Sequence, residues 1–474
     1  MPSGYEDAGE KVVARKLVIA TVAFAMLAFP MTMPLASADG MTHVYDDIYD
    51  DWSLSAEETQ YGMINLVGGS ERLLLAIRVD SDTLASADQA VWIFTVPGDP
   101  DLIDVDLMPS VREISGQPFS DTARREFCEN LIMGYGTQLY PVAALLLTPS
   151  MSPNLLLGQD SKDYGPGIEV STHIESRGMT MEVVSAQHAD ALEAYLLGLD
   201  LELDDGSASL IGEYIGDEYA FIVSWISDVE QFRLDVPMQY DRSTDEFYYE
   251  LGLFAKFPTD RVFYPLRLTS VYGESVVPML LQVLGFVEPD DSAADYGPLD
   301  IGIEHKVSNY YSIRPELSPF FTADGNSTVD EYMFLQNARY TEVVIRAPSD
   351  LLEADLWMVP ASSASLDVQL WVTENGFIAA LVVVLGLSSL AGVVSGALVF
   401  APHRPVLWKF AVLGLANVLS VVGLWLVARK LEIERTMTRS EVPVQATPYR
   451  ADFLFVYSFV FLASVTFVLM AFWA

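Results

Sequence analysis

The densest group of side chains able to bind a ligand is a run of four aspartates near the start of the chain. Asp46, Asp47, Asp50 and Asp51 form two adjacent pairs with two residues between them. Carboxylate oxygens at this spacing are hard ligands of the kind that Ca²⁺ prefers. The run lacks the glycine and the distal glutamate of an EF-hand loop, so a solvated acidic segment is the favoured interpretation. The sequence therefore predicts no cofactor, with calcium at these aspartates as the alternative.

Motifs of the common hydrolases and nucleotide-binding proteins are not found in the sequence. It contains no H-E-x-x-H, G-x-S-x-G, P-loop or dinucleotide-binding pattern. The lone cysteine, Cys128, is interpreted as a buried thiol in a helix over residues 122–133 rather than as a nucleophile. The histidines are isolated in sequence and are interpreted as surface or satisfied core residues: His43, His173, His188, His305 and His403. No catalytic residue is assigned from these patterns.

The first 38 residues have the pattern of a secretory signal peptide. Basic residues precede an apolar run over residues 17–35, and Ala36-Ser37-Ala38 matches the A-x-A cleavage site. Cleavage after Ala38 is the favoured interpretation and a retained signal anchor the alternative, and both place the following residues outside the cytoplasm. Asn326 opens an N-x-[ST] sequon, so we expect it to be available for glycosylation in an exported chain.

Negative charge is concentrated in the middle of the chain. Residues 39–370 contain 57 acidic and 16 basic side chains, a formal net charge of −41. Such a domain repels phosphate backbones, which argues against nucleic acid as a partner. The favoured interpretation is a heavily hydrated surface suited to high salt or to an acidic medium, and cation capture is the alternative. With one cysteine there is no intrachain disulfide, so the domain must be held together by burial alone.

Three apolar stretches follow the acidic region. Residues 377–400, 406–428 and 453–474 are 24, 23 and 22 residues long and carry no charge except Lys409. Each is long enough to cross a hydrocarbon core of about 30 Å, which predicts a three-helix transmembrane anchor. With the acidic domain outside, loop 429–452 also lies outside, although its five basic residues favour the cytoplasm under the positive-inside rule.

Small residues recur within the first of these stretches. Ser388, Gly392 and Gly396 share one helix face, which allows close approach of another helix. We expect this face to pack against the next two helices of the same chain, with homodimerisation as the alternative. Residues 131–158 are also apolar, but three prolines interrupt them, which predicts a short helix and a loop rather than a span.

Between the two ends, strand patterns outnumber helix patterns. Apolar runs at residues 63–67 and 72–79 flank Gly68-Gly69-Ser70 and predict a hairpin. Further strands are predicted, among them one over residues 262–268. The expected fold is α+β, a sheet-rich and largely antiparallel domain with a few inserted helices. The tetrapeptide D-Y-G-P occurs at residues 163–166 and 295–298, which indicates either two similar halves or chance reuse of turn residues.

Several segments occur in an order that resembles a domain-of-unknown-function family of exported, membrane-anchored prokaryotic proteins. They are Ala38-Asp39-Gly40, Ala90-Val91-Trp92-Ile93-Phe94-Thr95-Val96-Pro97, Asp190-Ala191-Leu192-Glu193-Ala194-Tyr195-Leu196, Tyr219-Ala220-Phe221-Ile222-Val223-Ser224-Trp225 and Val262-Phe263-Tyr264-Pro265-Leu266-Arg267-Leu268. The family has a W-x-x-P-V-P-like strand end and a Y-P-L-R-L strand, and the resemblance covers about residues 39–360. It implies export but brings no established activity and no catalytic residues.

The predicted organisation is a signal peptide (1–38), an acidic extracytoplasmic domain (39–370) and a membrane anchor (371–474). The favoured function is a non-enzymatic cell-envelope protein, anchored in the cell membrane, that displays an acidic binding or structural domain. A membrane-bound extracytoplasmic hydrolase with an unrecognised active site is the alternative, which a pocket grouping Ser or His with carboxylates would favour. The expected partners are the lipid bilayer and either an envelope protein or a second copy of the chain.

Overall fold

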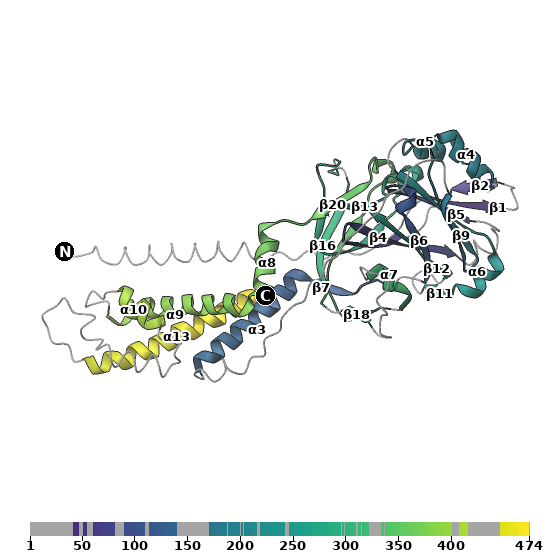
Figure 1. The fold of residues 1–474 in the computed structure, drawn as a ribbon. Helices are drawn as coiled ribbons and strands as arrows, with labels where there is room; N and C mark the ends of the chain where they lie inside the picture. The colour runs from purple at the N-terminus through teal and green to yellow at the C-terminus, as the bar shows by residue number, and fades with distance from the viewer. Residues whose placement is uncertain are drawn as a thin grey trace. The chain divides into compact units, whose positions relative to one another are not determined.

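A computed structural model describes residues 41–46, 51–54, 60–80, 90–109, 113–139, 170–321, 333–400, 407–415 and 446–473, apart from residues 187, 200, 202, 216–218, 242–245, 295, 298, 310, 314 and 336. The chain divides into two compact units (Figure 1). We call Pro34–Phe119 with Asn154–Ser362 the sheet unit, and Met1–Met33, Ser120–Pro153 and Ser363–Ala474 the helix unit.

The sheet unit contains a six-stranded sheet in which every neighbouring pair is antiparallel. Its order is β2(Asp51–Leu54), β1(Met41–Asp46), β5(Ala90–Pro97), β10(Tyr219–Ile226), β9(Met179–Val184) and β8(Val170–Ser176).

A nine-stranded sheet forms the rest of the framework, with one parallel pair between β3 and β14. Its order is β11(Met238–Asp241), β12(Glu246–Pro258), β4(Ser70–Asp80), β3(Gln60–Val67), β14(Met279–Leu284), β19(Arg339–Ile345), β16(Ile301–Ser308) and β7(Gly116–Pro118), and β6(Asp104–Pro109) pairs with β12. Smaller sheets join β13(Val262–Tyr264), β20(Leu356–Pro360) and β15(Val287–Pro289), and β17(Tyr311–Ile313) with β18(Met333–Leu335). The prediction of an α+β fold rich in antiparallel sheet is therefore confirmed.

Local turn chemistry sets two of the strand ends. The predicted hairpin is confirmed, because β3 and β4 are joined by Gly68 and Gly69 with φ of 64° and 75°, the positive values of a type I′ turn. The strand predicted over residues 262–268 is too long. It ends at Tyr264, since Pro265 cannot donate a ladder hydrogen bond, and the 3₁₀ helix η3(Arg267–Tyr272) follows.

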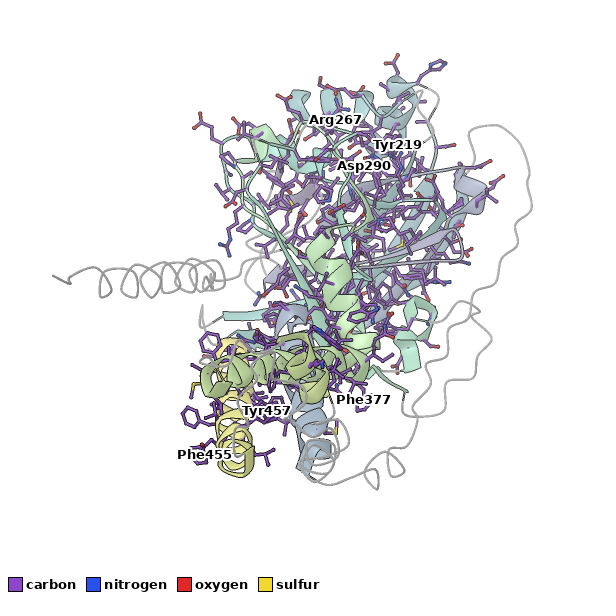
Figure 2. The ribbon with its side chains drawn as sticks, turned by 90° about the vertical axis from the view of Figure 1, so that its left-hand side faces the viewer. Tyr219, Arg267, Asp290, Phe377, Phe455 and Tyr457 are labelled. Carbon is purple, nitrogen blue, oxygen red and sulfur yellow. The ribbon has the colours of Figure 1, made fainter. Side chains whose placement is uncertain are left out.

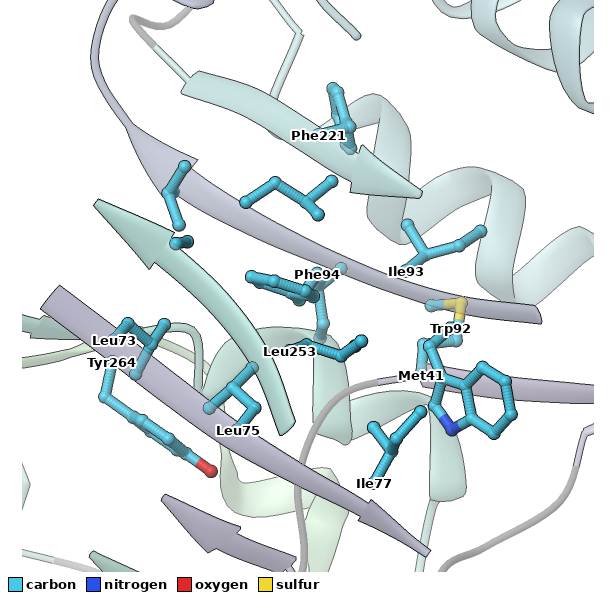
Figure 3. Packing of buried hydrophobic residues seen from close by; sticks show 14 of the residues in the cluster. Met41, Leu73, Leu75, Ile77, Trp92, Ile93, Phe94, Phe221, Leu253 and Tyr264 are labelled. Carbon is cyan, nitrogen blue, oxygen red and sulfur yellow. The ribbon is translucent and has the colours of Figure 1, made fainter. Parts of the chain in front are cut away.

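The core lies on both faces of the nine-stranded sheet. Side chains alternate along a strand, so Leu73 and Leu75 of β4 enter the largest apolar cluster while Leu74 enters a second cluster on the opposite face. The largest cluster also takes Phe94 of β5 and Leu253 of β12, so it joins the two large sheets (Figure 3). Burial of both faces explains why β4 is a continuous apolar run rather than an alternating one.

Short helices are inserted between the strands of the sheet unit: α4(Ala189–Leu197), α5(Asp205–Gly212), α6(Val229–Asp235) and α7(Ser318–Phe321). Aspartates begin two of them, because the Asp204 carboxylate accepts the backbone N–H groups of the first turn of α5 and Asp228 accepts that of Gln231 in α6. Leu192 and Leu196 of α4 are one helical turn apart and pack into the largest cluster.

The helix unit consists of α3(Phe119–Leu139), α8(Ala364–Glu374), α9(Gly376–Phe400), α10(Leu407–Leu415) and α13(Ala446–Trp473). Two of these helices are long and apolar enough to cross a membrane, over Gly376–Val399 and Asp452–Met470. Of the middle predicted span, α10 falls within the described residues and the rest lies outside them, as do residues 163–166 of the D-Y-G-P repeat.

Candidate functional site

The structure brings a serine, a histidine and a carboxylate together at the start of α5. Asp204 Oδ1 accepts the backbone N–H groups of Gly206 and Ser207, and Ser207 Oγ donates to Asp204 Oδ2 at 2.5 Å. β1 places His43 beside this turn, with Nε2 3.5 Å from Ser207 Oγ and 3.7 Å from Asp204 Oδ2. This is the combination of residue types that a hydrolase would use.

The geometry of this group differs from that of a catalytic triad. In a triad the carboxylate binds one imidazole nitrogen and the serine hydroxyl binds the other. Here both oxygens approach Nε2 of His43, while its Nδ1 has no hydrogen-bond partner among the described residues. Ser207 and His43 are only 0% and 2% exposed, so a substrate could not reach the hydroxyl. The group serves to cap α5 through the exposed Asp204 carboxylate, with His43 and Ser207 as its buried members.

Protonation of His43 follows from the same burial. Desolvation lowers the pKa of His43, while the nearby Asp204 carboxylate opposes that shift. The imidazole is therefore neutral at pH 7, so His43 contributes an uncharged polar side chain to this group.

A second polar cluster surrounds Asp355, which is almost fully buried at the start of β20. Its Oδ1 accepts the hydroxyl of Tyr214 at 2.8 Å and the backbone N–H of Arg267 at 3.0 Å. Its carbonyl oxygen accepts the hydroxyl of Tyr296 at 2.8 Å. Burial raises the pKa of Asp355 to about 6, although these donors oppose the shift. The cluster ties α5, η3 and β20 together.

Two partly exposed arginines, Arg261 and Arg267, lie next to this cluster. Arg267 forms an ion pair with Glu213, and its guanidinium carbon lies 5.8 Å from the ring centroid of Tyr214. Arg261 binds Asp290 at 2.8 Å and lies over the Trp357 ring. Each arginine thus binds a carboxylate and covers an aromatic ring, an arrangement that stabilises the fold.

Truncation of Asp355 tests this structural role. We expect Asp355→Ala to lower the free energy of unfolding by about 2–4 kcal/mol, because two donors lose their buried acceptor. Asp355→Asn retains an acceptor oxygen and should lose less than half as much. Urea denaturation of the full chain at pH 7 would measure both, with the exposed Asp291→Ala as control. Equal losses for the alanine and asparagine variants would contradict the role assigned to the acceptor oxygen.

An imidazole held between two carboxylates lies on β8, at the edge of the six-stranded sheet. His173 Nδ1 is 2.5 Å from Glu182 Oε1, and Nε2 is 3.2 Å from Glu175 Oε1. Tyr195 of α4 donates its hydroxyl to Glu182. Hydrogen bonds to the two carboxylates raise the pKa of His173. Because the carboxylates lie at opposite ring nitrogens, they do not converge on one point where a metal ion could sit.

The predicted aspartate site is described only in part. Asp46 and Asp51 are paired in the backbone register of β1 with β2, whereas Asp47 and Asp50 lie outside the described residues. No group of three or more His, Cys, Asp or Glu side chains that could hold a metal ion occurs in the part of the chain that the structure describes. The calcium alternative stays a prediction, as do cleavage at Ala38 and glycosylation at Asn326, which both lie outside the described residues.

The predicted helix-packing residues lie where α9 meets α10. A Cβ atom on Gly392 would overlap the carbonyl oxygen of Phe410, and one on Gly396 would lie 2.5 Å from the Phe410 ring. On the other helix, a Cβ on Gly414 would overlap the carbonyl oxygen of Ser388. The two backbones therefore touch along this stripe, and the choice between packing inside one chain and homodimerisation stays a prediction.

Other residues considered from the sequence occupy the core or structural positions. Cys128 is buried in α3, and His305 Nδ1 lies 3.2 Å from the Thr341 hydroxyl. His188 precedes α4 without capping it through its side chain. His403 lies outside the described residues.

Comparisons with known proteins give no family for this chain. No protein-family model matches the sequence, and no curated protein matches it. Among solved structures, a mutated baculovirus P35 after caspase cleavage is similar at 8% identity, over 62% of this chain and 99% of that chain, with a TM-score of 0.22. A likeness at this TM-score supports no inference about fold or role.

Proposed function

We propose that this chain is a membrane-anchored cell-envelope protein whose C-terminal helices lie in the cell membrane and whose acidic sheet unit is displayed outside it as a non-enzymatic binding or structural domain. The observation that carries the proposal is the exposure of large apolar side chains along the outward sides of α9 and α13.

Large apolar side chains cover the outward sides of these two helices. Six of them are between 55% and 76% exposed: Val382, Leu390 and Leu398 of α9 with Phe455, Phe459 and Phe467 of α13. In water this exposed apolar surface would be unfavourable at roughly 25 cal/mol per Å². In hydrocarbon the same side chains are stabilised, so the lipid core of a bilayer is the environment that suits them.

The inward side of α13 is organised for an apolar surrounding as well. Tyr457 is buried and donates its hydroxyl to the backbone carbonyl oxygen of Gly414 in α10 at 3.3 Å (Tyr457 and Phe455 are labelled in Figure 2). Ser464 donates to the carbonyl oxygen of Val460 within α13. Internal partners of this kind stabilise polar groups on a membrane helix, because lipid tails offer none.

Features next to the helices agree with this location. Trp371, about half exposed, lies in α8 a few residues before α9, where aromatic side chains favour the membrane–water interface. The signal-peptide pattern supports export of the sheet unit, and the charge of −41 over residues 39–370, most of which belong to that unit, suits a hydrated position outside the bilayer. The cluster of Asp204, Ser207 and His43 does not favour the hydrolase alternative, because the Ser207 hydroxyl is buried and bound to Asp204.

Thiol labelling on intact cells tests the proposal. In a Cys128→Ala background we expect a membrane-impermeant reagent to label Leu234→Cys, which is 79% exposed in the sheet unit. It should also label Thr438→Cys but not Ala474→Cys, since three crossings place the C-terminus in the cytoplasm. All three should react after lysis.

The outcomes distinguish export of the sheet unit from the number of membrane crossings that follow it. Labelling of Leu234→Cys only after lysis would overturn display of the sheet unit outside the membrane. Labelling of Ala474→Cys without Thr438→Cys would leave export intact and show that one of the three apolar stretches does not cross.

A further inference from the structure

Helix α3 changes from charged to uncharged halfway along its length. Its first half contains Asp121, Arg124, Arg125, Glu126 and Glu129, and Arg124 pairs with Asp121 at 3.1 Å on an exposed surface. From Asn130 onward the sequence has no Asp, Glu, Lys or Arg until Asp160, a stretch of 30 residues. This boundary resembles the one between water and hydrocarbon on a membrane helix.

Contacts place the uncharged half beside the first membrane helix. A Cβ atom on Gly376, the first residue of α9, would lie 2.5 Å from Asn130 Nδ2. Leu131 shares a buried cluster with Ala379 and Ala380 of α9.

The two helices run in the same direction along this contact. A Cβ on Gly134 of α3 would lie 3.7 Å from Val384 Cγ2 of α9, in ordinary van der Waals contact. From one contact to the next, the chain advances four residues along α3, from Asn130 to Gly134, and eight residues along α9, from Gly376 to Val384. At 1.5 Å per residue this is about 6 Å along α3 and about 12 Å along α9, so the helices run in the same sense without remaining level.

The opposite side of α3 is apolar and uncovered. Ile132 and Met133 are 50% and 51% exposed, next to Leu131, which is fully buried against the helix unit. They lie in the part of α3 that runs beside α9, whose own outward residue Val382 is 60% exposed. The lipid that suits Val382 therefore also suits Ile132 and Met133.

We infer that the second half of α3, from Asn130, enters the bilayer beside α9, with lipid acyl chains covering Ile132 and Met133. The inference rests on the proposed membrane location of α9. It gives the chain a membrane contact that comes from an insertion between β7 and β8, in addition to its C-terminal helices. The charged first half of α3 stays in water, where the Asp121–Arg124 pair is exposed.

Depth-dependent fluorescence quenching tests this placement. The full chain with Cys128→Ala would be reconstituted in phosphatidylcholine vesicles with or without lipids carrying a spin label on the acyl chain. An environment-sensitive dye would be attached at Ile132→Cys or Met133→Cys, with Val382→Cys as the membrane reference and Leu234→Cys as the aqueous reference. We expect the spin-labelled lipid to reduce fluorescence at residues 132 and 133 to the same extent as at 382, with no reduction at 234.

The other possible results distinguish the placement of α3 from the membrane location of α9. Quenching at residue 382 without quenching at 132 and 133 would overturn the placement of α3 and leave the anchor standing. Quenching by aqueous iodide would then show that residues 132 and 133 face water. Failure of iodide to quench would show that a second copy of the chain covers them. Absence of lipid quenching at residue 382 would overturn the membrane location of α9 itself, and the placement of α3 with it.

Discussion

Replacing Glu71 with glutamine is expected to stabilise the sheet unit at neutral pH and to change its stability little near pH 4.5. Glu71 is on β4, and its side chain is fully buried. Oε2 accepts the backbone N–H of Phe263 at 2.7 Å, and Oε1 has no hydrogen-bond partner among the described residues. A charged carboxylate in this position would lack a compensating cation or a second donor.

The sign of the pH effect follows from burial. Desolvation raises the pKa of Glu71 well above its ordinary value of 4.5, and the hydrogen bond from Phe263 opposes only part of that shift. Above pH 4.5 the unfolded chain releases the proton while the folded chain keeps it, so the free energy of unfolding falls as pH rises. The slope is about 1.4 kcal/mol per pH unit until the pKa of the folded state is reached. Glutamine does not titrate, so the variant lacks this loss.

Urea denaturation of the full chain in detergent micelles, followed by tryptophan fluorescence, would measure the difference at several values between pH 4.5 and 7. Glu193→Gln is the matched control, because it removes the same formal charge from an exposed position on α4. Asp355 also titrates in this range, but it is present in every variant and cancels from the comparison. A constant difference between Glu71→Gln and the unchanged protein across this range would show that Glu71 is not held protonated by the fold.

Features of the fold that depend on neighbours in sequence could be predicted from sequence. The Gly68-Gly69 turn defines a hairpin by its own backbone preferences, and the apolar run at β5 identifies a buried strand. The apolar residues after Pro265 favour a longer strand by pattern, but β13 ends at Tyr264 because Pro265 cannot donate a ladder hydrogen bond. The parallel pairing of β3 with β14 joins residues more than 200 positions apart, and no local pattern encodes it.

The polar clusters around Ser207 and Asp355 could not be predicted from sequence either, because their members are far apart along the chain. His43 and Ser207 are 164 residues apart, and Tyr214 and Asp355 are 141 apart, so no motif connects them. His173 and Glu175 are two residues apart on one strand, which was a usable signal, but Glu182 joins them only through the register of β8 with β9. The glycine stripe of α9 could be predicted, because helical spacing alone places its members on one face.

Enlarging Gly392 is expected to disrupt the packing of α9 with α10, whereas enlarging Gly386 on the same helix should be tolerated. A Cβ on Gly392 would overlap the carbonyl oxygen of Phe410 and lie 3.1 Å from the Cα of Gly414. A Cβ on Gly386 would have no atom within 4 Å. Overpacking a close contact costs about 1–3 kcal/mol, and backbone overlap places Gly392→Leu at the upper end of that range.

The matched pair Gly392→Leu and Gly386→Leu separates packing from insertion, since both variants add the same apolar side chain to α9. We expect both to insert in the membrane, and only Gly392→Leu to lower the temperature at which the full chain loses monodisperse elution after heating in detergent. Light scattering on the same samples would report the number of copies. If Gly392→Leu instead separated an oligomer into monomers without lowering that temperature, the stripe would serve association between copies, and the α9–α10 contact would not be the one that Gly392 maintains.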